Sequence, residues 1–283
     1  FLEHSRVYYF RSGSQEQLYL SSADWMNRNM LRRIELAWPI ENPALRQRII
    51  DECLAVAAVS GSSVTWVLNN HATIRSASRY GTPFAGTRPD GTPLRKHGGY
   101  WLMAGGNPVL LDAATGLRRA RAATTLLLAL PGSAYLYQGE ELGLQEVAEI
   151  PDSLRADPSF FRNREHEVGR DGCRVPIPWT RTGPSFGFGD GGAHLPQPLW
   201  FGRYSVEAET ADPSSTLSLY RRALELRREL QTDESLEWIP TDDDEVLRFR
   251  RPGGWEVVSN FGKAPVALPE GEVLLASGPV SDS

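Results

Sequence analysis

Apolar and polar positions change their spacing several times along this chain, and the sharpest change lies at residues 64–71. There the apolar run of residues 64–68, VTWVL, gives way at once to the polar residues Asn69, Asn70 and His71. A short apolar run with a polar exit predicts a parallel strand that is buried on both faces. Such a strand would deliver its last side chains to a site at its carboxyl end.

Two stretches downstream have the spacing of amphipathic helices, and a short strand is predicted between them. Apolar residues recur every three or four positions in residues 117–130 and again in residues 216–230. Pro131-Gly132 would end the first helix, and residues 134–137, AYLY, predict the next strand. This order of strands and helices predicts part of a (β/α)8 barrel, whose sites lie at the carboxyl ends of the strands.

The two ends of the chain have the patterns of β structure. Residues 7–10 and 17–20 predict a hairpin, and residues 33–39 predict a third strand. Asn42-Pro43 then predicts the start of a helix. After residue 235, short apolar runs are separated by turns. They predict strands at residues 246–250, 255–261, 266–268 and 273–275.

Composition narrows the class of protein. The 283 residues are 41% hydrophobic and 23% charged, which is typical of a globular protein with a sizeable core. The net charge of −5 gives no general attraction to nucleic acid or membranes, and no apolar run is long enough to span a bilayer. We expect no signal peptide, a cytoplasmic protein, and no nucleic acid or membrane partner. Cys53 and Cys173 are expected to be reduced, buried thiols, with a disulfide as the alternative.

Three strings in residues 62–283 carry a family resemblance. NNHA at 69–72, LALPGSAYLYQGEELGL at 128–144 and GRDGCRVPIPW at 169–179 resemble α-glucosidases of the α-amylase superfamily, glycoside hydrolase family 13. In that superfamily the seventh barrel strand ends in Asn-His-Asp. Here Asn70 and His71 are followed by Ala72, so the third residue of the motif lacks its carboxylate.

The resemblance implies a set of side chains that bind a sugar. His71, beside Asn70, would hydrogen-bond the hydroxyl groups of an α-glucoside or maltooligosaccharide. Arg170 or Arg174 would reach towards the same substrate with forked hydrogen bonds. Alternatively, Arg170 or Arg174 would brace its loop through an Arg–Asp pair, and the two roles are compatible. We expect neither a metal nor any other cofactor.

The residues around this set leave alternatives open. Residues 82–112 are rich in Gly, Pro and charge, and they predict a long surface loop beside the strand end. Tyr100 and Trp101 in this loop would either stack on a sugar or pack against the protein. Arg75 and Arg79 are expected to be solvated or to pin a loop rather than to act in catalysis.

The same resemblance implies that the catalytic carboxylates are missing. The family's nucleophile and general acid lie on barrel strands four and five, which would precede Val64, and Ala72 replaces the third acid. Glu140 and Glu141 cannot replace them as a pair, because adjacent residues of a strand point to opposite faces. Retaining glycosidases need two carboxyl groups about 5–5.5 Å apart across the scissile bond. We therefore expect no catalytic residue for hydrolysis in this chain.

The first part of the chain is similar to a different family. FLEHSR at 1–6, SSADWMNRN at 21–29 and RRIEL at 32–36 resemble the C-terminal end of polyphosphate kinase, which has a phospholipase-D-like fold. The resemblance covers about 55 residues and carries one role in phosphoryl transfer to His4. Phosphoryl transfer depends on positioning and charge stabilisation by many groups, which His4 with Arg6 cannot supply.

These observations divide the chain into four parts. They are a kinase-like α/β fragment at 1–55, a junction at 56–63, a partial (β/α)8 barrel at 64–235 and a small β domain at 236–283. The resemblance to the α-amylase superfamily implies that this last domain is a small β-sandwich. Three hypotheses follow: an α-glucosidase-like protein that is inactive alone, a polyphosphate kinase remnant, or a non-catalytic sugar- or partner-binding module. Because a partial barrel leaves strand edges unpaired, the first hypothesis includes a need for a complementing barrel fragment.

Overall fold

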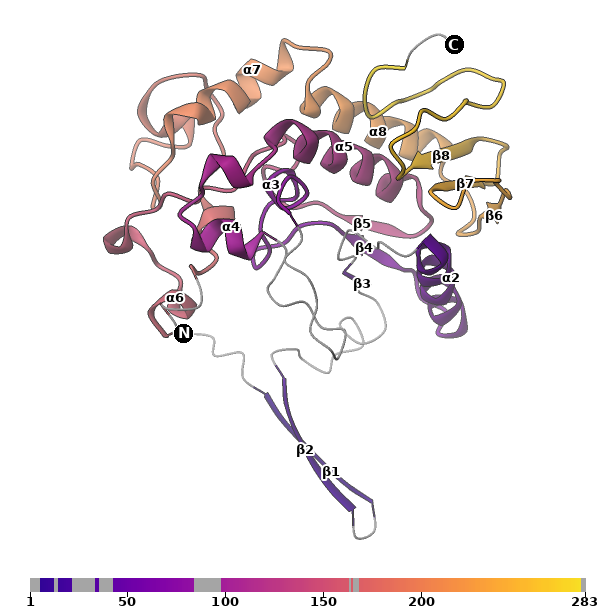
Figure 1. Ribbon diagram of the computed structural model, residues 1–283, viewed down its shortest axis with the longest axis horizontal. Coiled ribbons are helices and arrows are strands. Elements are labelled where there is room, and N and C mark those ends of the chain that lie inside the picture. The colour runs from indigo at the N-terminus through magenta and orange to yellow at the C-terminus, as the bar shows by residue number, and fades with distance from the viewer. Residues whose placement is uncertain are drawn as a thin grey trace.

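The computed structural model of the chain describes residues 6–12, 15–21, 34–35, 43–83, 98–162, 164 and 168–280. At its centre is a parallel sheet in the order β3 (Ile34–Glu35), β4 (Thr65–Val67) and β5 (Ser133–Tyr135). The long helices α2 (Pro43–Val59), α5 (Ala113–Ala129) and α8 (Thr216–Leu230) follow these strands in chain order. Figure 1 shows α5 and α8 side by side above the sheet, so the described chain contains three successive β/α units.

The central strand has the parallel partners that its apolar sequence predicts. Trp66 lies opposite Ala134 in the register, and its side chain is fully buried. Its indole N–H donates a hydrogen bond of 2.6 Å to the carbonyl oxygen of Pro131. Gly132 turns the chain between α5 and β5 with a φ of +103°, in a place where a Cβ would collide with the Val64 carbonyl. The prediction of a buried parallel strand at residues 64–68 is therefore confirmed.

The other elements are shorter and surround these three units. Strands β1 (Arg6–Ser12) and β2 (Gln15–Ser21) form the predicted antiparallel hairpin. The remaining strands are β6 (Glu237–Trp238), β7 (Val246–Arg250) and β8 (Glu256–Asn260), which form an antiparallel sheet in that order. The short helices are α3 (Ser76–Arg79), α4 (Gly99–Met103), α6 (Pro158–Arg162) and α7 (Val206–Thr210). The 3-10 turns are η1 (Pro108–Leu110), η2 (Asp152–Leu154), η3 (Asp171–Arg174), η4 (Pro184–Gly187) and η5 (Leu199–Tyr204).

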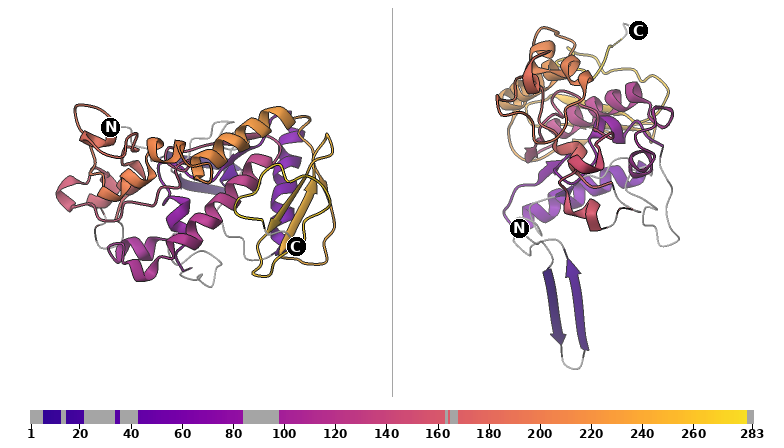
Figure 2. Two further views of the ribbon diagram at one scale, coloured as in Figure 1. Left: turned by 90° about the horizontal axis from the view of Figure 1, so that it is seen from above. Right: turned by 90° about the vertical axis from the view of Figure 1, so that its left-hand side faces the viewer.

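Helix α2 connects the kinase-like part of the sequence to the rest of the core. Its residues Ile50, Cys53 and Ala57 belong to one buried apolar cluster with Trp66 and Phe249. This cluster therefore joins the first β/α unit, the central strand and the C-terminal sheet. Figure 2 shows the C-terminal sheet lying against α2.

Polar contacts hold α2 against the same C-terminal sheet. The guanidinium of Arg46 is buried, 3.1 Å from the carboxylate of Glu245 and 4.2 Å from the ring centre of Phe261. The indole N–H of Trp238 donates a hydrogen bond of 2.7 Å to Asp51. These contacts fix a helix of one sequence origin on a sheet of the other.

Helices α5 and α8 are joined by an arginine as well as by apolar packing. Arg227 of α8 donates hydrogen bonds to the carbonyl oxygens of Leu128, Leu130 and Gly132, where α5 ends. The last carbonyl oxygens of a helix have no N–H donor within the helix. The guanidinium of Arg227 supplies the missing donors here.

Some elements differ in extent from those that the sequence predicts. Helix α5 begins four residues early, at Ala113, because Asp112 caps it by accepting the N–H of Thr115 at 3.0 Å. Helix α2 continues to Val59, so residues 56–59 of the predicted junction are helical. The long loop expected at residues 82–112 contains α4 and η1, while residues 84–97 lie outside the described part.

The C-terminal part has fewer strands than the sequence predicts. Residues 266–268 form no strand, because Pro265 and Pro269 bracket them and cannot donate to a ladder. Residues 273–275 form none either, and Leu275 instead packs singly against the core. A three-stranded antiparallel sheet is present, whereas a separate β domain, a β-sandwich and a phospholipase-D-like N-terminal fold stay predictions. Helix α8 has the bounds that we predict, residues 216–230.

Two predictions about the whole chain can be checked within the described residues. Both cysteines are buried and form no disulfide, as expected. In the described ranges, no helix has the length and apolar character needed to cross a bilayer.

The packing of α2 generates a stability prediction. Ile50→Ala removes buried methyl groups from the core and should lower the free energy of unfolding by about 2–4 kcal/mol. Val59→Ala on the same helix is the matched control, because Val59 is 92% exposed, and should change it by less than about 0.5 kcal/mol. Urea denaturation measures both. Equal, small effects would show that α2 does not belong to the core.

Candidate functional site

The carboxyl ends of β4 and β5 carry a buried polar network. Asn69 is buried at the end of β4, where its amide accepts the N–H of Ser76 at 2.8 Å and donates to the hydroxyl of Ser76 at 3.1 Å. The same amide group donates to the carboxylate of Glu140, which follows β5. Glu140 also accepts the N–H of Tyr137 at 3.0 Å. Asn69 thus ties the ends of two neighbouring strands to α3.

The turn after Asn69 presents the residues that the family motif singles out. The side-chain oxygen of Asn70 accepts the backbone N–H of Ala72 at 2.8 Å. The backbone N–H of Asn70 donates to the hydroxyl of Thr73 at 3.1 Å. Asn70 therefore shapes the turn, while His71 at the tip is exposed to solvent. Ala72 leaves this turn without the carboxylate of the family motif.

Two buried arginines hold the loops around this turn. Arg75 donates hydrogen bonds of 2.6 Å to the carbonyl oxygen of Gln138 and 2.9 Å to that of Cys173. Arg79 donates to the carbonyl oxygen of Leu68 at 2.7 Å. Of the two expected roles, pinning of loops is confirmed, and neither side chain is solvated.

Arg75 also contacts a buried acid that the sequence analysis does not single out. The backbone N–H of Arg75 donates to the carboxylate of Glu146 at 2.8 Å. Burial raises the pKa of Glu146 to about 7, and the charges of Arg75 and Arg79 offset only part of this effect. Burial likewise raises the pKa of Glu140 to about 7, against the hydrogen bond from Asn69.

The surroundings of Glu140 and Glu141 differ from those that the sequence analysis assumes. They lie in a turn that follows β5 rather than in the strand itself. Glu140 accepts from Asn69 and Tyr137, and Glu141 accepts the N–H of Gly139 at 2.7 Å. Both carboxylates are therefore committed to holding the loop.

Arg170 is braced by an acid that lies 13 positions earlier in the sequence. Its guanidinium donates two hydrogen bonds to Asp157, at 2.7 and 2.8 Å, and its N–H donates a third at 2.7 Å. Burial alone would raise the pKa of Asp157, but the hydrogen bonds from Arg170 and Ser159 outweigh it and hold the pKa well below the usual range. Asp171 accepts the N–H groups of Ala156 and Asp157 instead. The expected Arg–Asp brace therefore uses Asp157.

Arg174 connects the loop after β5 to the motif turn. Its Nε–H donates a hydrogen bond of 2.9 Å to the carbonyl oxygen of His71, and its side chain is half-buried. This contact fixes the backbone on which the imidazole of His71 is exposed. The structure therefore brings Asn70, His71 and Arg174 together.

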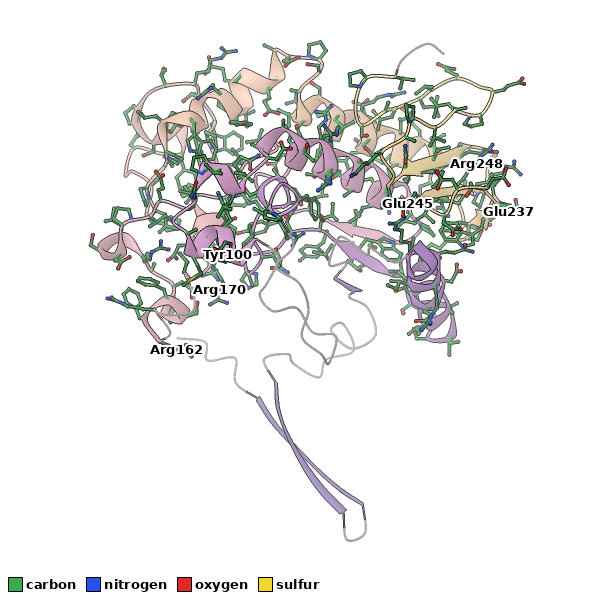
Figure 3. The ribbon with its side chains drawn as sticks, viewed as in Figure 1. Tyr100, Arg162, Arg170, Glu237, Glu245 and Arg248 are labelled. Atoms are coloured by element: carbon green, nitrogen blue, oxygen red, sulfur yellow. The ribbon has the colours of Figure 1, made fainter. Side chains whose placement is uncertain are left out.

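The two loop aromatics have different environments. Trp101 is buried in α4 and packs against the protein, whereas Tyr100 is 57% exposed. Figure 3 shows Tyr100 and Arg170 on the same side of the molecule, far from Glu245 and Arg248 of the C-terminal part. Tyr100 is thus the loop aromatic that remains accessible to a ligand.

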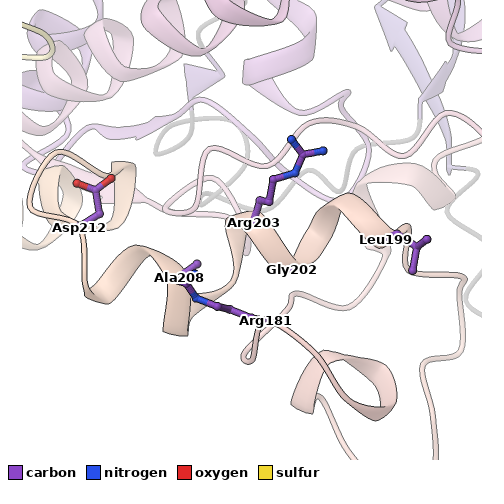
Figure 4. A pocket seen from close by; sticks show the side chains of 6 residues that line it. All are labelled: Arg181, Leu199, Gly202, Arg203, Ala208 and Asp212. Atoms are coloured by element: carbon purple, nitrogen blue, oxygen red, sulfur yellow. The ribbon is translucent and has the colours of Figure 1, made fainter.

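A hollow of the described part of the chain lies away from the turn at residues 70–72. It has a volume of about 430 Å³ and is lined by residues of η5 and α7 together with Arg181 and Asp212. Figure 4 shows Arg181 and Arg203 pointing in different directions, so the two cations do not converge on one ligand. Within the described ranges, no cluster of His, Cys, Asp and Glu could hold a metal ion.

Sequence reasoning missed part of this site. Glu146 and Asp157 give no local signal, because their partners Arg75 and Arg170 are distant along the chain. Asn69, in contrast, lies in the string NNHA at 69–72, so the sequence did contain a signal for it. His4, the residue of the kinase hypothesis, lies outside the described residues.

Two family models match separate parts of the chain. Residues 110–234 match the catalytic domain of α-amylase, and residues 1–82 match the polyphosphate kinase C-terminal domain 2. Both resemblances expected from the sequence are thereby confirmed. The kinase match extends beyond residue 63, where we place the end of the junction, so the boundary between the two parts stays a prediction.

Curated relatives match the first part of the chain. The polyphosphate kinase of Paraburkholderia phytofirmans is 49% identical over 70 residues, which cover 25% of this chain and 10% of that kinase. The kinase of Burkholderia multivorans is 55% identical over 56 residues, which cover 20% of this chain and 8% of the kinase. The chain thus spans about a tenth of the length of these relatives.

Solved structures match most of the chain. The α-glucosyl transfer enzyme XgtA is 28% identical with a TM-score of 0.60, over 82% of this chain and 38% of that enzyme. Two further structures show the fold alone. The Bacillus licheniformis trehalose-6-phosphate hydrolase is 22% identical (TM-score 0.56, 80% of this chain, 39% of that one), and a trehalulose synthase MutB mutant is 24% identical (TM-score 0.57, 84% and 42%). The fold is therefore that of part of a (β/α)8 barrel carbohydrate enzyme.

The buried acids generate a prediction about pH. Between about pH 5 and pH 7, folded protein retains protons on Glu140 and Glu146 that the unfolded chain, with an ordinary pKa of 4.5, has released. The free energy of unfolding should therefore fall as pH rises, by about 1.4 kcal/mol per pH unit for each such proton. Glu209, whose pKa burial also raises to about 7, adds to this slope. Urea denaturation at a series of pH values measures it.

A pair of variants tests how much Glu146 contributes to this change in the free energy of unfolding with pH. Glu146→Gln should reduce the slope by the share of one proton, because the amide does not titrate. Glu149→Gln, at an exposed neighbouring acid, should leave the slope unchanged. Stability that rises between pH 5 and pH 7 would contradict the raised pKa values.

Proposed function

We propose that this chain is an α-glucosidase-like protein that binds an α-glucoside or maltooligosaccharide and does not hydrolyse it by itself. The observation that carries the proposal is the turn at residues 70–72. Asn70 and Arg174 fix its backbone, His71 is exposed at its tip, and Ala72 supplies no carboxylate. The turn therefore retains groups that could bind a sugar, without the acid that stands there in the family.

Two arginines support the binding half of this proposal. Arg170 is oriented by Asp157 and keeps 36% of its side chain exposed, so it can be braced and still reach a ligand. Arg174 lies next to His71 through its carbonyl contact. Imidazole and guanidinium groups donate hydrogen bonds, which suits sugar hydroxyl groups as acceptors.

The nearby acids support the absence of hydrolysis. Glycoside hydrolysis needs a carboxylate that attacks or activates water and a second carboxyl group that protonates the leaving oxygen. Glu140 and Glu146 are buried, and Glu140, Glu141 and Glu146 all accept hydrogen bonds from groups that shape the site. This arrangement does not favour any two of the three as the pair of carboxyl groups on either side of a glycosidic bond.

Binding without turnover is the test of this proposal. Isothermal titration calorimetry with maltose should give saturable binding to the wild-type chain. His71→Ala should weaken it about tenfold, the loss of one or two hydrogen bonds at about 1.4 kcal/mol. His194→Ala is the matched control, since His194 is exposed in another loop, and should bind like the wild type.

A turnover assay completes the same test. Release of p-nitrophenol from p-nitrophenyl α-glucoside should stay at background for the wild type. Ala72→Asp should also remain inactive, because it restores only one of the three family acids. Turnover by the wild-type chain would refute the absence of hydrolysis, and equal binding by His71→Ala would refute the assigned site.

A second candidate function is phosphoryl transfer, which the 49% identity to polyphosphate kinase favours. The match covers a tenth of that kinase, and phosphoryl transfer requires many positioned charges. We therefore expect no polyphosphate formation from radiolabelled ATP by the purified chain, and no labelling of His4. Labelling that is lost in His4→Ala but retained in His194→Ala would establish this function instead.

A further inference from the structure

The dipeptide Asp-Gly occurs at three places in the sequence, and the structure describes two of them. Asp190-Gly191 lies in the loop that follows η4, and Asp171-Gly172 opens η3. Asp90, of the third pair, lies outside the described residues. Because glycine has no Cβ, a neighbouring side chain can approach its backbone nitrogen closely. The two described pairs therefore share their chemistry and differ in what the fold places around them.

The surroundings of Asp190 are open. Its side chain is exposed and, within the described ranges, has no hydrogen-bond or ion-pair partner. The turn that carries Asp190 and Gly191 is closed by a hydrogen bond of 3.4 Å from the N–H of Gly192 to the carbonyl oxygen of Gly189, which is long for this kind of bond. A Cβ placed on Gly191 would meet no atom within 4 Å. Exposed loop tips of small residues open easily, so the Asp190 carboxyl group can reach the nitrogen of Gly191.

The surroundings of Asp171 are closed. Its side chain is 1% exposed, and its Oδ2 accepts the N–H groups of Ala156 and Asp157, each at 3.1 Å. The next residue is enclosed as well, since a Cβ on Gly172 would collide with the carboxylate of Glu146. The Asp171 carboxylate cannot turn towards the nitrogen of Gly172 without leaving two buried N–H groups unpaired, which is costly.

We propose that Asp190 is a site of spontaneous isoaspartate formation in the folded protein, and that Asp171 is protected from this modification. The backbone nitrogen of Gly191 attacks Cγ of Asp190 and forms a C–N bond, while a Cγ–O bond breaks and the hydroxyl group leaves as water with the amide proton. Water then opens the cyclic succinimide. Opening at Cγ restores aspartate, whereas opening at the backbone carbonyl carbon places Cγ in the main chain. The reaction needs no cofactor, and the proposal does not depend on the proposed function.

The fold should survive this change, because both ends of the loop are anchored. Before the loop, the carbonyl oxygen of Phe186 accepts the N–H groups of Trp179 at 2.8 Å and Thr180 at 2.9 Å. After it, Leu195 is 2% exposed and belongs to the apolar cluster that contains Phe201. Isoaspartate lengthens only the backbone between these anchors. The circular dichroism spectrum should therefore stay the same as the modification accumulates.

Digestion with endoproteinase Asp-N tests both sites in one experiment, because this enzyme cleaves before aspartate and not before isoaspartate. The wild-type chain is incubated folded at neutral pH, then denatured, digested and analysed by mass spectrometry. We expect the uncleaved fragment 171–211 to accumulate with time and the uncleaved fragment 157–189 to stay at its starting level. The same incubation in concentrated urea should produce both fragments, because unfolding removes the protection of Asp171.

Two alanine variants separate the attacking nitrogen from the general mobility of the loop. Gly191→Ala should slow the accumulation of fragment 171–211 several-fold, because the added methyl group hinders approach to the nitrogen. Gly189→Ala is the matched control, since it makes the same change on the other side of Asp190, and it should react like the wild type. A Cβ at either glycine would meet no atom within 4 Å, and neither glycine has a positive φ, so both variants should fold.

A second measurement detects isoaspartate directly. An isoaspartyl methyltransferase supplied with radiolabelled S-adenosylmethionine should label the incubated wild-type chain, and label Gly191→Ala several-fold less. Equal accumulation of the two fragments from folded protein would overturn the proposal. So would the absence of fragment 171–211 over a period in which the chain in urea yields it, or equal slowing by Gly189→Ala and Gly191→Ala. Maltose binding affects none of these outcomes.

Discussion

The pairing of β4 with a parallel strand on each side is the constraint on which the rest of the structure depends. It buries Trp66 completely, and helices α2 and α5 and the C-terminal sheet pack in the apolar cluster around that side chain. Because both edges of β4 are occupied, the position of its carboxyl end is fixed. The polar residues 69–72 are therefore presented from a rigid base, which a site built on a strand end requires.

Buried charges in this protein mainly satisfy backbone groups. Arg75, Arg79 and Arg227 each donate to carbonyl oxygens of loops or helix ends, and Glu146 accepts the N–H of Arg75. Such groups would be costly to bury without partners. The polar strand end is thus largely a frame for the turn on which His71 is exposed.

Two sequence origins share one core. The kinase-like part contributes β3 and α2, which stand in the place of the β/α unit before β4. Helix α2 packs Ile50 against the core and Arg46 against Glu245, so this part is integrated rather than appended. A parallel strand followed by an amphipathic helix is a unit that many sheets can accept, because its requirements are a pairing edge and an apolar face.

Local patterns in the sequence were sufficient to predict the buried parallel strand β4, the helix at 216–230, both family resemblances and the replacement of an acid by Ala72, because periodicity and motifs are local. These patterns did not predict that the cap at Asp112 starts α5 at Ala113, or that residues 266–268 and 273–275 form no strand. The three-dimensional structure was needed to show that Asp157 braces Arg170 and that Glu146 lies beside Arg75. Each of these depends on which distant residues meet, and no local pattern records that.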